Sequence, residues 1–114
     1  MTVIFRGRRA CTCLAAWLPE FEKELLRRRL IKKNLDITQL IGGAPASGGT
    51  HTKGGAFDIW QTSQKVVEVA RLMGAPATWS RRRSSSWSPH IHGVLHGCPH
   101  SGPANGRESP ASRL

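Results

Sequence analysis

Apolar side chains recur along this chain with two different periods, which predicts a mixture of helices and strands. From Cys13 to about Leu30 they recur at three- and four-residue steps, the spacing of one face of a helix. Pro19 falls within this stretch, so the pattern fits either two helices or a main helix that begins near Pro19. In the second piece glutamates come early and basic residues come late, an order that complements the helix dipole.

Shorter segments with alternating apolar residues, bounded by glycine or polar residues, predict strands. They lie near residues 36–41, 55–60, 77–80 and 90–96, and residues 3–5 fit a further short strand or an ordered lead-in. Ser63 is placed to cap a second helix over 64–73, which Gly74 ends. We therefore expect an α+β fold in which two main helices cover one face of a small antiparallel sheet that carries the functional site.

The chain has the length of one domain with a modest core. We expect residues 1–98 to form this domain. Residues 99–114 are rich in Gly, Pro, Ser and Arg, which predicts a disordered tail.

Residues with metal-binding chemistry fall in two of the predicted strands. Asp58 lies between apolar neighbours, where a carboxylate is costly unless it is paired or bound to a metal. His90 and His92 are two residues apart, so in a strand they point the same way. His51 precedes Asp58 in a glycine-rich segment whose backbone can turn tightly. His96 shares the face of His90 and His92 by alternation, but its place near the strand end favours solvent exposure.

Three such groups closing on one divalent ion, with a fourth position left for water, form the usual catalytic zinc site. His51 with Asp58, and His90 with His92, form two such clusters in the sequence, and together they predict bound Zn²⁺. The alternative is that Asp58 caps or salt-bridges locally and that the histidines are polar loop residues.

Residues 48–58 read Gly-Gly-Thr-His-Thr-Lys-Gly-Gly-Ala-Phe-Asp, which resembles the Ser-x-His-x-x-Gly-x-Ala-x-Asp motif of the zinc D-Ala-D-Ala peptidase family. Four residues fall at the motif's positions: His51, Gly54, Ala56 and Asp58. Residues 87–92, Trp-Ser-Pro-His-Ile-His, resemble the family's closing Trp-His-x-His segment, which is also seen in hedgehog-like domains. The resemblance covers about half of the chain, from roughly Gly42 to Cys98.

The family includes carboxypeptidases, dipeptidases and phage L-alanyl-D-glutamate endopeptidases. The resemblance implies that His51, Asp58 and His92 hold Zn²⁺ and that the substrate is a peptidoglycan peptide. It places Thr50 and Trp87 among the residues that contact this substrate. It also implies a phage lysis or tail protein that acts at the bacterial cell wall.

The chain departs from the family pattern at two points. The leading Ser is Gly49, and residues 79–91 contain no carboxylate where the family places a Glu or Asp as general base. His90 is the predicted base instead, because an imidazole with an ordinary pKa of ~6.5 exchanges protons near neutral pH. Two outcomes stay open: a peptidase that uses His90, and a zinc-containing wall-binding domain that has lost hydrolysis.

The net charge of +10, from 17 basic and 7 acidic residues, favours polyanionic partners. Nucleic acid, an anionic cell wall and a merely solvated basic surface all fit this charge. His-Ile-His also resembles the metal motif of rolling-circle nicking enzymes, but these attack DNA with a tyrosine and the chain contains none. Nucleic acid is therefore the less favoured partner, and a basic nucleic-acid-binding module stays as an alternative.

The three cysteines, Cys11, Cys13 and Cys98, are an odd number, which argues against a secreted disulfide framework and predicts reduced thiols. With His100 they include the ligand types of a second zinc site, although the Cys-x-Cys spacing is unusually tight. No apolar run approaches the ~20 residues of a membrane helix. The N-terminal basic and apolar residues lack a small-residue cleavage site, which predicts cytoplasmic synthesis without a signal peptide.

Overall fold

The computed structural model describes residues 2–41, 54–83 and 88–99, and within them the chain forms two helices and six strands. In chain order these are β1 (Thr2–Phe5), β2 (Arg8–Cys11), α1 (Thr12–Arg27), β3 (Ile37–Gln39), β4 (Ala56–Ile59), α2 (Gln64–Leu72), β5 (Ala77–Arg81) and β6 (His90–Val94). The predicted α+β class is confirmed. The tail predicted over 99–114 lies, apart from Pro99, outside the described residues.

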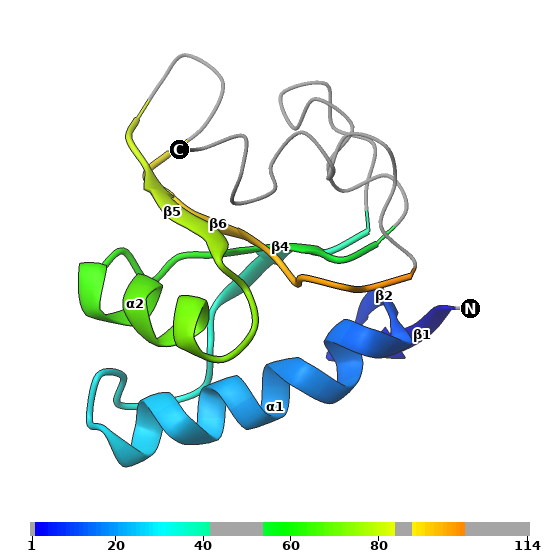
Figure 1. Cartoon of the computed structure of the whole chain (residues 1–114), viewed down its shortest axis with the longest axis horizontal. Helices are drawn as coiled ribbons and strands as arrows, with labels where there is room; N and C mark the ends of the chain where they lie inside the picture. The colour runs from blue at the N-terminus through cyan, green and yellow to red at the C-terminus, as the bar shows by residue number, and fades with distance from the viewer. Residues whose placement is uncertain (1, 42–53, 84–87, 100–114) are drawn as a thin grey trace.

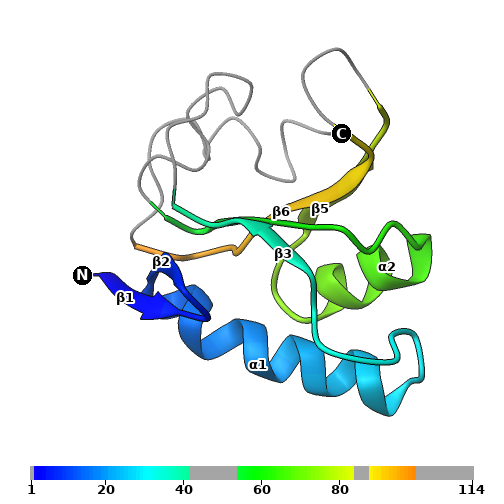
Figure 2. The ribbon, with the colours of Figure 1, turned by 180° about the vertical axis from the view of Figure 1, so that it is seen from behind.

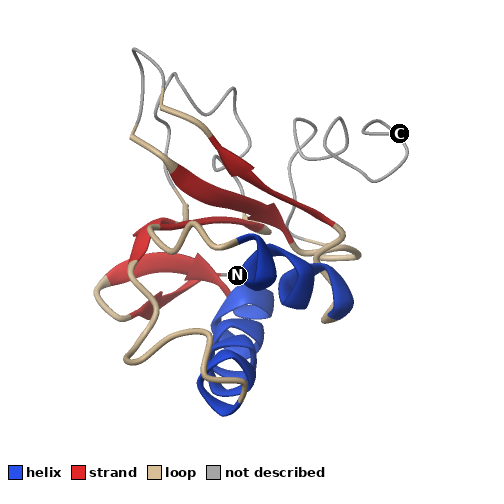
Figure 3. Cartoon of the chain, turned by 90° about the vertical axis from the view of Figure 1, so that its left-hand side faces the viewer, coloured by secondary structure: helices blue, strands red, loops and turns tan. Residues whose placement is uncertain are grey.

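Four strands form one antiparallel sheet in the order β3-β4-β6-β5, and they are the four segments that the alternation predicted. Both helices lie on the same side of this sheet (Figures 1 and 3). Ser63 caps α2 as predicted, because its side chain accepts a hydrogen bond from the Lys65 amide. Seen from behind, β3 crosses above α1 at one edge of the sheet (Figure 2).

β1 and β2 form a separate hairpin beside the start of α1, and β2 was not predicted. The two residues between the strands, Arg6 and Gly7, have φ angles of 51° and 83°. Positive φ at both central positions is typical of the tight turn whose twist matches paired strands. The basic residues around this turn gave no alternating apolar pattern, so the sequence did not indicate a second strand.

The core lies between the helices and the sheet. Its large, fully buried apolar side chains come from α1, α2, β4, β6 and the residue after β3. They are Leu14, Leu18, Phe21, Leu25, Leu40, Phe57, Ile59, Val66, Val67 and Ile91. Trp17 stacks on Phe21 with ring centroids 4.7 Å apart and lies 5.3 Å from the ring of Phe57. The Trp17 indole also donates a hydrogen bond of 2.7 Å to the carbonyl of Met73, which joins α1 to the end of α2.

α1 runs without interruption from Thr12 to Arg27 and contains Pro19, so the predicted break at this residue is wrong. Pro19 costs one intrahelical hydrogen bond because it has no N–H. The apolar stripe nevertheless continues on both sides of it, and Leu18 and Phe21 are buried in the same core. Burial of this continuous stripe offsets the cost of the proline, since most helix stability in proteins comes from packing.

The predicted dipole arrangement is correct only at the end of α1, where Arg27 lies in the last turn. The first turn contains no acidic residue, because the helix begins at Thr12 and not near Pro19. Glu22 is instead buried, and its carboxylate accepts hydrogen bonds of 2.5 and 2.8 Å from Arg6 and one of 2.8 Å from the Leu35 amide. One carboxylate thus ties the hairpin turn and the segment before β3 to the helix. The Arg6 guanidinium, helped by the Leu35 amide, holds the pKa of Glu22 below its ordinary value of 4.5.

We predict that Glu22→Gln lowers the free energy of unfolding at neutral pH by about 1.5–3 kcal/mol, because hydrogen bonds to a charged group are lost. The depressed pKa means that this contribution is present above about pH 4.5 and is lost as the pH falls through the lower pKa of the folded state. The difference between wild type and variant, measured by urea denaturation across this range, should therefore shrink in acid.

Glu20→Gln is the matched control on the same helix, because the Glu20 carboxylate is exposed and lies 3.4 Å from Lys23 on the surface. Its stability should stay close to that of the wild type. Equal effects of the two substitutions would contradict the role given to Glu22.

Gly93, in the middle of β6, lies directly opposite Phe57 of β4 and Thr78 of β5. A Cβ atom at this position would lie 2.6 Å from the Thr78 hydroxyl oxygen and closer still to the Phe57 ring. Both neighbours are fully buried, and Thr78 is held by a hydrogen bond of 2.7 Å to the Ala75 carbonyl. Glycine therefore lets the Phe57 ring lie across the backbone of β6.

We predict that Gly93→Ala lowers the free energy of unfolding by about 1–3 kcal/mol, because a tightly packed core must shift to admit the methyl group. Urea denaturation measures the loss. Ser80→Ala, at an exposed position of β5, serves as control and should cost much less. An alanine at position 93 that left stability unchanged would show that Phe57 can rearrange freely.

Candidate metal centre

The register of the sheet brings Asp58, His92 and Trp79 into one row. Asp58 of β4 lies directly opposite His92 of β6, and His92 lies directly opposite Trp79 of β5. Phe57, one residue from Asp58, belongs to the core between the helices and the sheet. Since successive side chains of a strand point to opposite faces, the row lies on the face of the sheet away from the helices.

Asp58 and His92 form a buried hydrogen-bonded pair. Their exposed fractions are 7% and 0%, and His92 Nδ1 lies 2.8 Å from Asp58 Oδ1. The carboxylate oxygen accepts, so Nδ1 carries the proton that is shared in this bond. The buried carboxylate of Asp58 is thus paired, and its partner His92 lies 34 positions away in the sequence.

His90 lies on the same face and completes a cluster around the carboxylate. Its Nε2 is 3.6 Å from Asp58 Oδ2, and its Nδ1 is 2.8 Å from the backbone carbonyl of Ser88. Because a carbonyl can only accept, Nδ1 must be the donor, and Nε2 of the neutral ring is then the nitrogen with a lone pair. His90 Nε2 therefore faces the Asp58 carboxylate.

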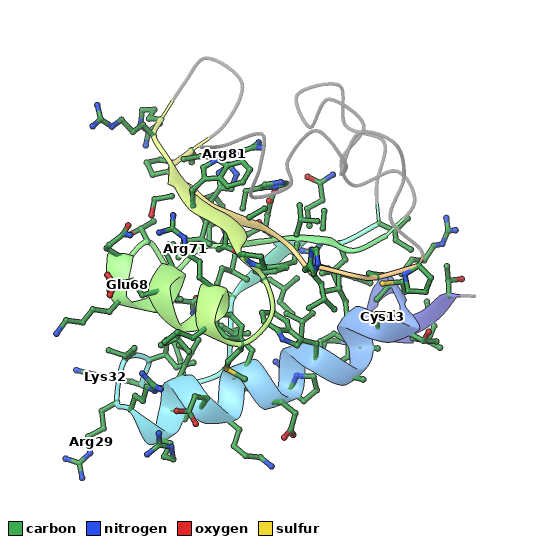
Figure 4. All side chains as sticks on the ribbon, in the orientation of Figure 1. Cys13, Arg29, Lys32, Glu68, Arg71 and Arg81 are labelled. Atoms are coloured by element: carbon green, nitrogen blue, oxygen red, sulfur yellow. The ribbon has the colours of Figure 1, made fainter. Side chains whose placement is uncertain are left out.

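Trp79 and Arg81 border this cluster, and Trp79 was not identified as a site residue from the sequence. The Trp79 ring lies 5.2 Å from the His92 ring, and the Arg81 guanidinium lies 5.7 Å over the Trp79 ring. Arg81 is also the cross-strand partner of His90 and lies on the upper side of the sheet in Figure 4. Alternation from Ala77 along β5 puts both residues on one face, but only the strand order reveals that this face is shared with His92.

Three predicted site residues, His51, Thr50 and Trp87, lie outside the described residues, as do the serines at 84–86. The structure brings together Asp58, His90 and His92 of the predicted set. His96 is exposed, in agreement with the expectation for the end of the strand.

Of the second predicted zinc cluster, Cys11 and Cys98 lie together with their sulfurs 3.7 Å apart, and Cys13 is half-buried on α1. His100 lies outside the described residues. In the described part of the chain, no three His, Cys, Asp or Glu side chains form a group arranged to hold a metal.

The donors of Asp58 and His92 fit a divalent ion in type and approximate spacing. A carboxylate oxygen and an imidazole nitrogen are both common zinc ligands, and two donors on one tetrahedral zinc lie about 3.3 Å apart. The observed distance of 2.8 Å between His92 Nδ1 and Asp58 Oδ1 is that of a hydrogen bond. Metal ligands must be deprotonated, so an ion bound here would take the place of the proton in this bond. These two residues supply two donors, and a third ligand would have to come from elsewhere in the chain.

Comparison of the chain with known protein families, curated proteins and solved structures finds no significant match. The resemblance to zinc peptidases accordingly depends on the residues themselves. None of the helices in the described residues has the length and apolar character needed to cross a bilayer.

We predict that the purified chain binds about one Zn²⁺ and that Asp58→Ala, His92→Ala and His51→Ala each weaken this binding by about 100-fold or more. The reason is that each substitution removes one donor atom. Elemental analysis after dialysis and calorimetric titration with Zn²⁺ measure the effect.

His96→Ala is the matched control, since it removes an exposed imidazole a few residues after β6. It should bind zinc as the wild type does, and circular dichroism should show that all variants are folded. Zinc binding that is lost equally in the control, or is absent from the wild type, would contradict the site.

Proposed function

We propose that this chain is a zinc-dependent peptidase that hydrolyses amide bonds in the stem peptides of peptidoglycan, as in phage lysis or tail proteins. The observation that carries the proposal is the buried Asp58–His92 pair, with donor atoms 2.8 Å apart on facing positions of adjacent strands. The sequence motif around His51 and Asp58 and the closing His-x-His segment supply the link to wall peptidases.

In this proposal Asp58 and His92, together with His51, hold the ion. A zinc ion held there would polarise an amide carbonyl and would make a water bound to the ion acidic enough to ionise near neutral pH. Burial of Asp58 and His92 keeps both donors in fixed positions, which lowers the entropic cost of binding the ion.

His90 is the proposed general base. Its Nδ1 donates to the Ser88 carbonyl, and this bond fixes both the tautomer and the orientation of the ring. Nε2 then has the lone pair, lies beside Asp58 and can take a proton from a nucleophile held there. In this proposal Trp79 and Arg81, which lie next to His92 and His90, contact the peptide and its carboxylates.

A wall-binding domain without hydrolytic activity is the second candidate. The specific observation in its favour is that residues 79–91 contain no Asp or Glu, so the usual carboxylate base of such peptidases has no counterpart there. This candidate has the same zinc ligands and differs only in turnover.

We predict that the zinc-loaded chain releases new free amines from purified cell wall and that His90→Ala lowers the rate by about 10²–10⁴-fold with little change in bound zinc. An amine-reactive dye measures the release. His96→Ala should retain the wild-type rate.

Pelleting of the chain with cell wall, without amine release, would favour the binding domain over the peptidase. A salt-sensitive shift of DNA in a gel, with no need for metal, would favour a nucleic-acid-binding module instead. The basic residues labelled in Figure 4 do not form one continuous surface for nucleic acid. Arg29 and Lys32 lie just after α1, whereas Arg81 lies on the sheet.

A further inference from the structure

Cys11 and Cys98 come from opposite ends of the described chain and lie side by side in the fold. They are separated by 87 positions, and their sulfur atoms lie 3.7 Å apart. Cys11 is the last residue of β2 and the residue before α1, and Cys98 follows β6 after a turn in which Gly97 has a φ of 76°. Both side chains belong to the hydrophobic core.

We propose that Cys11 and Cys98 are the site of an intramolecular disulfide that ties the N-terminal hairpin to the segment after β6. The sulfurs must approach from 3.7 Å to about 2.05 Å, a movement on the scale of a side-chain rotation. The fold already holds the two thiols together, so the entropic cost of closing the loop between them does not oppose formation of the bond. This proposal is independent of the zinc site, because neither cysteine belongs to the row of Asp58 and His92.

The bond forms by exchange with a small-molecule disulfide such as oxidised glutathione. The Cys98 thiolate, at 8% exposure the more accessible of the two, attacks one sulfur of this reagent and expels the first small thiolate. The Cys11 thiolate then attacks the Cys98 sulfur of the mixed disulfide and expels the second. The two protein thiols lose two protons and two electrons, and the reagent is reduced to two small thiols.

Cys13 is the natural competitor, since it is half-buried at the start of α1, near the hairpin (Figure 4). It lies two residues after Cys11, in the first turn of α1. The geometry assigns the bond to Cys11 because the short contact of 3.7 Å joins this residue to Cys98.

The test uses the full chain, folded, incubated with oxidised glutathione and then alkylated. Peptide mass mapping without reduction should show a Cys11–Cys98 link, and thiol titration in denaturant should fall from three thiols to one. Because the link closes a loop of nearly the whole domain, Tm of the oxidised chain should exceed that of the reduced chain by about 10 °C.

Cys13→Ala should retain both the link and the Tm difference, whereas Cys98→Ala should abolish both. The mapping of the wild-type chain decides the question even where a variant fails to fold. A link that contains Cys13, a stable glutathione adduct on Cys98 without closure, or three thiols that persist after oxidation would each overturn the proposal.

Discussion

The antiparallel pairing of β4 with β6 is the constraint on which the rest of this structure depends. It sets Asp58 opposite His92 and Phe57 opposite Gly93, so one register fixes the polar pair on one face and the aromatic packing on the other. A slip by one residue would turn Asp58 into the core and Phe57 out of it. The hydrophobic core therefore enforces the geometry of the polar pair, since the register that buries Phe57 and Ile59 also brings the carboxylate to the imidazole.

The two faces of β4 and β6 differ in what surrounds them: one packs against the helices and the other carries the polar row. Beneath the sheet, Gly93 leaves room for the Phe57 ring, which reaches Trp17 and Phe21 of α1. Above it, His92 is packed between the Asp58 carboxylate and the Trp79 ring. The helix packing and the polar row thus meet at neighbouring positions of a single strand, and a change in one is felt by the other.

The sequence predicted those parts of the fold that short-range patterns encode. Alternation located all four strands of the sheet, and the Ser63 cap located α2. Pro19 was misjudged because local helix propensity disfavours it, whereas burial of residues on both sides decides in favour of one helix. The strand β2 was missed because its first residues are exposed arginines, and only pairing with β1 makes them a strand.

The sequence predicted which polar residues belong to the candidate site, but it did not predict all of the residues that surround them. His90 and His92 could be chosen from their spacing, because a period of two places them on one face, and Asp58 could be chosen as a carboxylate between apolar neighbours. Trp79 could not be chosen in this way, since no local sequence pattern indicates that β5 pairs with β6 rather than with β4. The role of Glu22 was likewise hidden, because its partners Arg6 and Leu35 come from segments that only the folded chain brings to the helix.

The strand order has one more effect, on the way the sheet fluctuates. In the part of the chain that the structure describes, β3 and β5 are the outer strands and β4 and β6 the inner ones. Local opening of a sheet starts where backbone hydrogen bonds are least supported, which is at its margins. Excursions that detach an outer strand leave the carboxylate and the imidazole joined across the middle, so the pair outlasts the breathing motions of the strands that surround it.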